Sequence, residues 1–318
     1  IGGGGTYAAI GARIWYFIPV KTGPQLKGIA FSFRLPPNKI GMIVDTGNDF
    51  PQDIKDKLHS YGSEMWLFRE QPNRGTTRAL NSYRGDHRGF EYTTPRIRLT
   101  PKDLRNTKLE KPEFLHFICS PTRALSIIAE IDDGWSPTTI YEPIPDRCVP
   151  QELPSLIKVL PSISVLSPNA EEALSLLSLP LPPVKSTIES AARRFLDLGV
   201  GRNGQGWVII RSGAMGAFIQ SNGTEGRWIE AYWTKENIDK VVDVTGAGNA
   251  FLGGLAAGMA LSEGDIPTAT LYATVSASFV IEQEGLPPLD SINGNIWNGE
   301  SASQRLDALR KRHESKAD

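Results

Sequence analysis

The residues best suited to chemistry lie in a glycine-rich turn within the stretch VVDVTGAGNAFLGGLAAGMA at 241–260. Apolar residues lead into Gly246 and Gly248, and the small and apolar residues that follow predict a buried helix. The start of a helix has unpaired backbone N–H groups and a partial positive charge, and glycine lets a ligand approach the main chain. The pattern favours a site for phosphate or a developing oxyanion. The same residues would also be expected in a tight turn before a close-packed helix.

Polar residues at the start of another predicted helix, at about 169–178, have the types that interact with magnesium. Ser167 and Pro168 suit the cap and first position of a helix, and Asn169 and Glu172 share one helical face. A carboxylate and an amide fixed on a helix suit Mg²⁺, which keeps most of its waters. The alternative is a well-capped surface helix with acidic residues in its first turn.

The composition narrows the possible partners. The chain has 318 residues with 40% hydrophobic residues and a net charge of −1, which gives no sign of a nucleic-acid or membrane partner. Cys119 and Cys148 have no metal-binding spacing, and the four histidines are scattered, so we expect reduced thiols and a cytoplasmic protein. No apolar run predicts a transmembrane helix, and the N-terminal residues do not resemble a signal peptide. We expect a monomer or homodimer.

A second glycine turn, Gly2 to Gly5, leads into a predicted helix of small residues near the N-terminus. A Walker A loop is excluded because no Gly-Lys-Ser/Thr follows. Gly3, Gly5 and Ala8 fit the Rossmann form G-x-G-x-x-A, but no acidic residue occurs before Asp45 to bind a ribose. The dinucleotide interpretation is therefore the weaker one.

The elements that must position these turns alternate between strands and helices. From residue 114 onward, apolar runs rich in β-formers alternate with helical segments, which predicts a parallel sheet with helices on both faces. The expected strands are 41–45, 64–68, 114–118, 138–142, 163–166, 207–211 and a second strand ending near 219, and the expected helices are 51–61, 121–131, 150–159, 169–178, 186–199 and 268–282. Residues 76–83 and 89–92 flank a charged turn and predict a hairpin, which alone would be an ordinary edge hairpin.

Asp243-Val244-Thr245-Gly246-Ala247-Gly248, followed by Ala250-Phe251 and Gly253-Gly254, resembles the C-terminal signature of the ribokinase (PfkB-type) family of sugar and nucleoside kinases. The resemblance implies an α/β fold, a three-layer sandwich around a mostly parallel, doubly wound sheet, with a small and partly missing β lid. We expect one domain over residues 1–300, with the lid hairpin at about 76–93, and a C-terminal surface helix or tail at 301–318. In that family a first core strand with a substrate-binding aspartate precedes the N-terminal glycine turn, which would place it ahead of Ile1.

The resemblance also implies roles for individual residues. The family has an aspartate as general base where this sequence has Asn249, and an asparagine that binds the sugar where it has Tyr7. Glu142-Pro143-Ile144-Pro145-Asp146-Arg147 lies where the family has Asp-Pro-x-x-Arg, although it also fits a surface loop. The implied residues are Gly246, Ala247, Gly248 and Asn249 for catalysis, Gly3, Gly4, Tyr7, Asp49, Thr77 and Arg78 for the substrate, Ser212, Gly213, Gly216, Thr245, Ala273 and Ser276 for the nucleotide, and Asn169 and Glu172 for the metal.

Two classes of function follow from these residues. The first is an ATP- and Mg²⁺-dependent phosphotransferase acting on a sugar, nucleoside or other small hydroxylated molecule, with weak turnover because an asparagine amide cannot accept the hydroxyl proton. The second is a catalytically inactive kinase fold that binds a ligand or partner as a scaffold. A third alternative is an enzyme that uses the same anion site for chemistry other than phosphoryl transfer.

Overall fold

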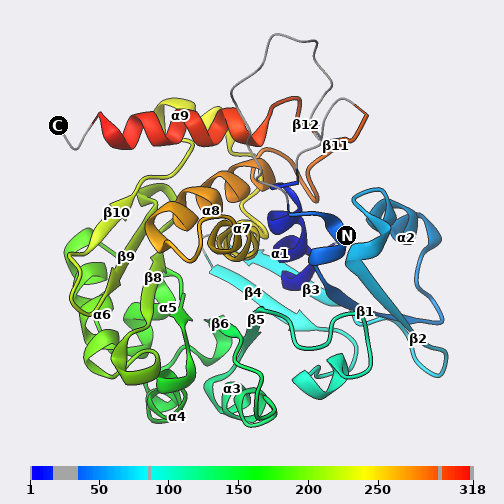
Figure 1. Cartoon of the computed structure of the whole chain (residues 1–318), viewed down its shortest axis with the longest axis horizontal. Coiled ribbons are helices and arrows are strands. Elements are labelled where there is room, and N and C mark those ends of the chain that lie inside the picture. Colours follow the sequence, from blue (N-terminus) through cyan, green and yellow to red (C-terminus); the bar gives the residue numbers. More distant parts are fainter. Residues whose placement is uncertain (1, 17–34, 85–86, 293–295, 316–318) are drawn as a thin grey trace. The chain divides into compact units, whose positions relative to one another are not determined.

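Figure 1 shows the computed structural model, in which residues 2–16, 35–84, 87–292 and 296–315 are described. The chain divides into two units, and each is considered by itself: Pro36–Glu110 forms the first, and Gly2–Leu35 with Lys111–Asp318 forms the second. The expectation of one domain over 1–300 stays a prediction.

The first unit contains a parallel pair of strands and a hairpin. Strands β1 (Met42–Gly47) and β2 (Trp66–Gln71) pair in parallel and are connected through helix α2 (Gln52–His59). Strands β3 (Ala79–Arg84) and β4 (His87–Tyr92) pair antiparallel, which confirms the predicted hairpin. An ion pair of 2.8 Å between Arg69 Nε and Asp45 Oδ1 links β2 to β1.

The second unit is built on a six-stranded sheet in the order β10-β9-β8-β7-β6-β5. Strands β5 to β8 are parallel, and β9 and β10 continue the sheet antiparallel. The strands are β5 (Phe114–Cys119), β6 (Thr138–Pro143), β7 (Val165–Leu166), β8 (Trp207–Arg211), β9 (Ala217–Ser221) and β10 (Arg227–Ile229). The connecting helices are α3 (Pro121–Ile128), α4 (Leu153–Val159), α5 (Ala170–Leu176) and α6 (Lys185–Asp197). The predicted alternation of strands and helices is confirmed.

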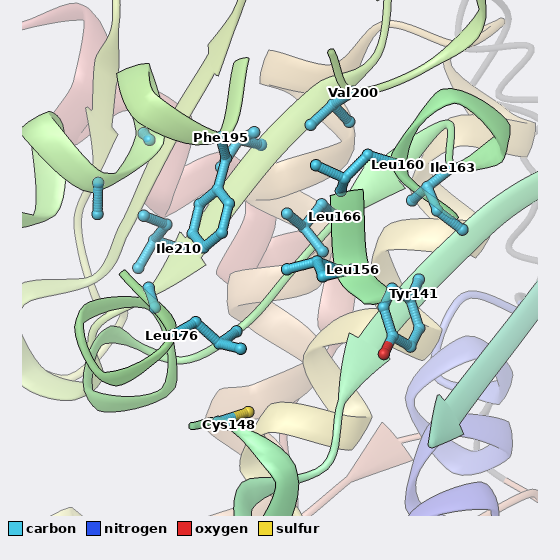
Figure 2. Close-up of a cluster of buried hydrophobic side chains, with 14 of the residues drawn as sticks. Tyr141, Cys148, Leu156, Leu160, Ile163, Leu166, Leu176, Phe195, Val200 and Ile210 are labelled. Atoms are coloured by element: carbon cyan, nitrogen blue, oxygen red, sulfur yellow. The ribbon is translucent and has the colours of Figure 1, made fainter. Parts of the chain in front are cut away.

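Alternate residues of these strands enter two different cores, because successive side chains of a strand point to opposite faces. Tyr141, Leu166 and Ile210 join the core formed with helices α3 to α6, part of which is drawn in Figure 2. Ile140 and Val165 join the core on the other face, formed with α7 (Ala247–Leu261) and α8 (Ile266–Val280). The predicted three-layer sandwich is confirmed.

Helices α7 and α1 (Gly4–Arg13) pack with their backbones in contact. A Cβ atom built on Gly253 would lie 1.8 Å from Ala8 O, and one on Gly11 would lie 2.1 Å from Ala250 O. The small residues after the turn are therefore required by helix packing. This packing holds the glycine turn at the start of α1 close to the start of α7.

The C-terminal part of the second unit has a short antiparallel pair, β11 (Leu289–Asp290) and β12 (Ile296–Trp297), and helix α9 (Ala302–Glu314). In Figure 1, α9 lies along α8. The predicted surface helix has a buried face, where Arg305 is only 3% exposed. Its guanidinium lies 3.7 Å from the ring centroid of Phe279 and 2.7 Å from Glu282.

Cys119 and Cys148 are free thiols in the core, which confirms that they are buried and reduced. Burial raises the pKa of the Cys148 thiol well above its ordinary range. In the described ranges, no helix has both the length and the apolar character needed to cross a membrane.

Candidate active site

The predicted turn at 241–248 does precede a helix. Gly246 caps α7 with φ of 81°, a conformation that favours glycine, and the Ala250 N–H donates to Gly246 O at 2.9 Å. The Thr245 N–H donates to Asp243 Oδ1 at 2.9 Å, which stabilises the preceding turn. Helix geometry leaves the N–H groups of Gly248 and Asn249 without an acceptor inside the helix, and both residues are partly exposed. These groups can bind an anion.

The start of α1 lies against this turn. A Cβ on Gly4 would come within 3.3 Å of the Asn249 side chain, and a Cβ on Gly246 would come within 2.3 Å of the Tyr7 ring. The structure thus brings Gly4 and Tyr7 together with Gly246 and Asn249. Tyr7 is 3% exposed, so its ring packs behind the turn. This burial argues against the prediction that Tyr7 binds a substrate, while Gly3, which caps α1, is exposed.

Asn249 is held by a carboxylate that the resemblance did not assign to the site. Its Nδ2 donates to Glu142 Oε2 at 3.0 Å, and Glu142 Oε1 accepts from Arg211 Nη2 at 2.7 Å. Glu142 lies near the end of β6 and Arg211 at the end of β8, on the two sides of β7, and because these strands are parallel both residues lie at one edge of the sheet. His116 on β5 is also close, with Nε2 at 3.8 Å from Glu142 Oε2.

The electrostatics of this cluster keep Glu142 ionised. Burial acts to raise the pKa of Glu142, but the charge of Arg211, with His116 close by, outweighs it and holds the pKa below its ordinary value. An ionised carboxylate only accepts hydrogen bonds, so the amide nitrogen of Asn249 must face it. Asn249 Oδ1 is then the atom that can accept a hydrogen bond from a substrate hydroxyl, but it cannot take the proton.

Asn169 and Glu172 form a reciprocal cap on α5. Glu172 N–H donates to Asn169 Oδ1 at 2.8 Å, and Asn169 N–H donates to Glu172 Oε2 at 2.7 Å. Burial raises the pKa of Glu172 to about 7, with Arg211 opposing this shift and Glu142 adding to it. The Arg211 guanidinium lies 3.7 Å from Glu172 Oε2.

These residues do not fit the predicted magnesium site. The facing oxygens of Asn169 and Glu172 are used in the cap, and a fixed positive charge already lies beside the carboxylate. Across the described residues, no group of three or more histidine, cysteine, aspartate or glutamate side chains is arranged to hold a metal ion. The alternative interpretation of 167–172, a well-capped helix, describes this geometry better.

The turn after β8 joins the site through Arg211. Gly213 and Gly216 have φ of 55° and 89°, and the Ser212 N–H donates to Gly216 O at 2.7 Å. Ser212 is 8% exposed and its hydroxyl donates to Ile210 O, so it is turned inward. A Cβ on Gly213 would meet no atom within 4 Å, which leaves its main chain open to a ligand.

The predicted adenine-pocket residues lie elsewhere. Ala273 and Ser276 on α8 are fully buried. The Ser276 hydroxyl donates to Gly11 O at 2.9 Å and accepts from Trp15 Nε1 at 2.8 Å, while a Cβ on Gly254 would lie 3.0 Å from Ala273 Cα. The two residues therefore pack α8 against α1 and α7, which argues against a role in binding a base.

The remaining substrate candidates belong to the first unit. Asp49 Oδ1 accepts from the Thr76 N–H at 2.6 Å, and Asp49 Oδ2 lies 2.6 Å from Arg78 Nη2. The Thr76 N–H, followed by the charge of Arg78, lowers the pKa of Asp49. Thr77 Oγ1 accepts from Arg74 at 3.3 Å. Asp49 and Arg78 thus form one polar cluster, and Thr77 is adjacent to it in the chain.

The sequence reasoning missed Arg211, Glu142 and His116 as members of the site. A signal was present, because each is a polar residue within or directly after an apolar strand whose neighbours are buried. Glu142 was noted only as part of a strand-end motif. In contrast, Arg147 of the same motif pairs with Glu152.

Comparison with known proteins gives the family of this fold. The model of the pfkB family of carbohydrate kinases matches residues 46–290. An uncharacterized protein of Schizosaccharomyces pombe is 34% identical over 96% of this chain and 85% of its own length. Protein MAK32 of Saccharomyces cerevisiae is 33% identical over 96% of this chain and 84% of its own length.

Solved structures share the fold at low sequence identity. Ribokinase of Arabidopsis thaliana, complexed with ribose and ATP, superposes with a TM-score of 0.61 at 18% identity, covering 97% of this chain and 87% of that chain. A putative ribokinase II of E. coli, in complex with ATP and Mg²⁺, has a TM-score of 0.58 at 19% identity, covering 98% and 89%.

Proposed function

Because this chain belongs to the pfkB family of carbohydrate kinases, we propose that it is a slow phosphotransferase that uses ATP to phosphorylate a hydroxyl group of a sugar, nucleoside or other small molecule. The observation that carries this proposal is the start of α7, where the N–H groups of Gly248 and Asn249 lie beside the guanidinium of Arg211. N–H groups at a helix start and a guanidinium are the groups that stabilise a transferring phosphoryl group.

In the proposed reaction, the substrate hydroxyl oxygen attacks the γ-phosphorus of ATP while the bond from that phosphorus to the bridging oxygen breaks, and ADP leaves. Asn249 Oδ1 accepts the hydrogen bond of the hydroxyl and orients it. The proton departs to water or to the phosphate itself. Lack of a general base costs about 10²–10⁴-fold in rate, so slow turnover is expected.

The test measures transfer of labelled γ-phosphate from ATP to a panel of sugars and nucleosides. The expected result is a phosphorylated product with at least one substrate, formed faster by a variant with a carboxylate at position 249. Absence of product with every substrate, for both the wild type and Asn249→Asp, would contradict the proposal.

A second candidate function is nucleotide binding without transfer. The bond between Asn249 and Glu142 favours it, because the residue at the base position is engaged with the protein itself. This candidate predicts that ATP stabilises the protein, by about 2.7 kcal/mol at 100 times its Kd, without any phosphorylated product.

A further inference from the structure

The guanidinium of Arg211 lies among three oxygen acceptors at one edge of the sheet. Its Nη2 atom is 2.7 Å from Glu142 Oε1, 3.1 Å from Ser167 O and 3.7 Å from Glu172 Oε2. These three acceptors come from β6, from the end of β7 and from α5, so the guanidinium links two strands and a helix at this edge of the sheet.

The same guanidinium reaches the proposed phosphate site. A Cβ built on Gly248 would lie 1.9 Å from Arg211 Nη1, so the guanidinium touches the first turn of α7. A side chain at 248 would therefore require the guanidinium to move from this position. The side chain is 11% exposed, and its buried Nε has no acceptor among the described residues.

A metal ion bound at this place would have to contact both the carboxylates at the edge of the sheet and the phosphate groups at the start of α7. Magnesium bound beside a phosphate chain neutralises the phosphate charge and is held in turn by protein carboxylates. A guanidinium does both with fixed geometry, since it pairs with a carboxylate on one edge and offers further N–H groups to phosphate. A divalent ion placed here would meet the charge of Arg211 at close range, and the cap on α5 occupies the oxygens of Asn169 and Glu172 that face each other.

We propose that Arg211 takes the place of the divalent cation, so that this protein binds the phosphate chain of a nucleoside triphosphate in its metal-free form. The inference rests on the proposed function, because it requires a nucleotide at the start of α7. It adds a property that family membership does not predict, namely affinity that is independent of Mg²⁺.

Calorimetric titration of the full chain with ATP, in EDTA and in excess MgCl₂, tests this directly. The expected Kd values for the wild type agree within about threefold in the two buffers. Arg211→Met alone would leave the buried Glu142 unpaired, so the test variant combines Arg211→Met with Glu142→Gln. It should lose at least about tenfold in affinity in EDTA. Arg194→Met, on an exposed part of α6, is the matched control and should bind as the wild type does.

The outcomes separate this inference from the proposed function. Wild-type affinity that is about tenfold or more higher in MgCl₂ than in EDTA overturns the inference and leaves the proposed function standing. Equal affinity of the double variant and the wild type in EDTA also overturns it, provided that circular dichroism shows a folded variant. Absence of ATP binding by the wild type in both buffers refutes the proposed function and the inference together.

Discussion

Replacing Asn249 by Asp should cost stability in a pH-dependent manner. In the wild type, Asn249 Nδ2 donates to the ionised Glu142 at 3.0 Å. In Asn249→Asp the same contact joins two carboxylates, whose repulsion at about 3 Å and an effective dielectric constant of about 20 is about 5 kcal/mol. The pair can avoid this repulsion only by taking up a proton.

The size of the effect follows from the cost of that proton. Protonating a carboxyl group with an ordinary pKa of about 4 costs about 1.4 kcal/mol at pH 5 and about 5 kcal/mol at pH 8. We therefore expect Asn249→Asp to lower the free energy of unfolding, relative to the wild type at the same pH, by about 1.5 kcal/mol at pH 5 and about 5 kcal/mol at pH 8. The sign follows because the folded variant holds a proton that the unfolded chain has lost.

Urea unfolding of the wild type and of Asn249→Asp at pH 5 and pH 8 measures this difference in the free energy of unfolding. A second variant, Asn249→Asp with Glu142→Gln, exchanges donor and acceptor and should recover part of the lost stability at pH 8. Asn222→Asp is the matched control, because Asn222 is exposed and donates its amide to a backbone oxygen, Gly204 O, at 2.9 Å. Equal stability of Asn249→Asp and the wild type at pH 8 would refute the assigned contact and the ionised state of Glu142.

Three further predictions concern stability, each measured as the free energy of unfolding. Gly253→Ala should destabilise by about 1–3 kcal/mol, because the added Cβ would lie 1.8 Å from Ala8 O. The pKa of Glu172 is about 4.5 in the unfolded chain and about 7 in the folded protein, so the free energy of unfolding of the wild type falls by up to about 3 kcal/mol as the pH rises between these values. Glu172→Gln should reduce this pH dependence. Arg305→Met should cost about 3–5 kcal/mol, because Glu282, 2.7 Å away, would lose its buried partner.

Each of these three has a control at an exposed position: Gly2→Ala, Glu171→Gln and Lys311→Met, respectively. A Cβ on Gly2 would meet no atom within 4 Å. A destabilisation by Gly2→Ala equal to that at Gly253 would contradict the backbone contact between α1 and α7. If the stability of Glu172→Gln depends on pH as the wild type's does, the raised pKa of Glu172 is contradicted. If Arg305→Met lowers the free energy of unfolding only slightly, the buried ion pair with Glu282 is contradicted.

Local patterns were enough to predict most of the fold. Strands such as β6 and β8 read as apolar runs between helices, and the glycines at 246 and 248 marked the start of α7. The polar network could not be predicted in this way. Arg211 and Asn249 contact Glu142 across separations of 69 and 107 residues, and these contacts depend on the order of the strands and on the packing of α7.

A local sequence pattern can also fit two different roles. Ala273 and Ser276 lie on a helix of small residues, which is a composition that suits a ligand pocket and a close helix contact equally well. The partners decide between the two, and Gly11 and Gly254 belong to distant parts of the chain. The spacing of Asn169 and Glu172 likewise fits both a metal site and a helix cap, and in the structure their mutual hydrogen bonds form a cap.

The glycine contacts of α7 have a mechanical consequence. Gly253 joins its backbone to α1, and Gly254 and Gly258 bring it against α8, so the three helices form one stiff block. A ligand arriving at Gly248 cannot push α7 away from α1 without breaking these contacts. The start of α7 is therefore a fixed wall of the candidate site, and a ligand that binds there has to match its position.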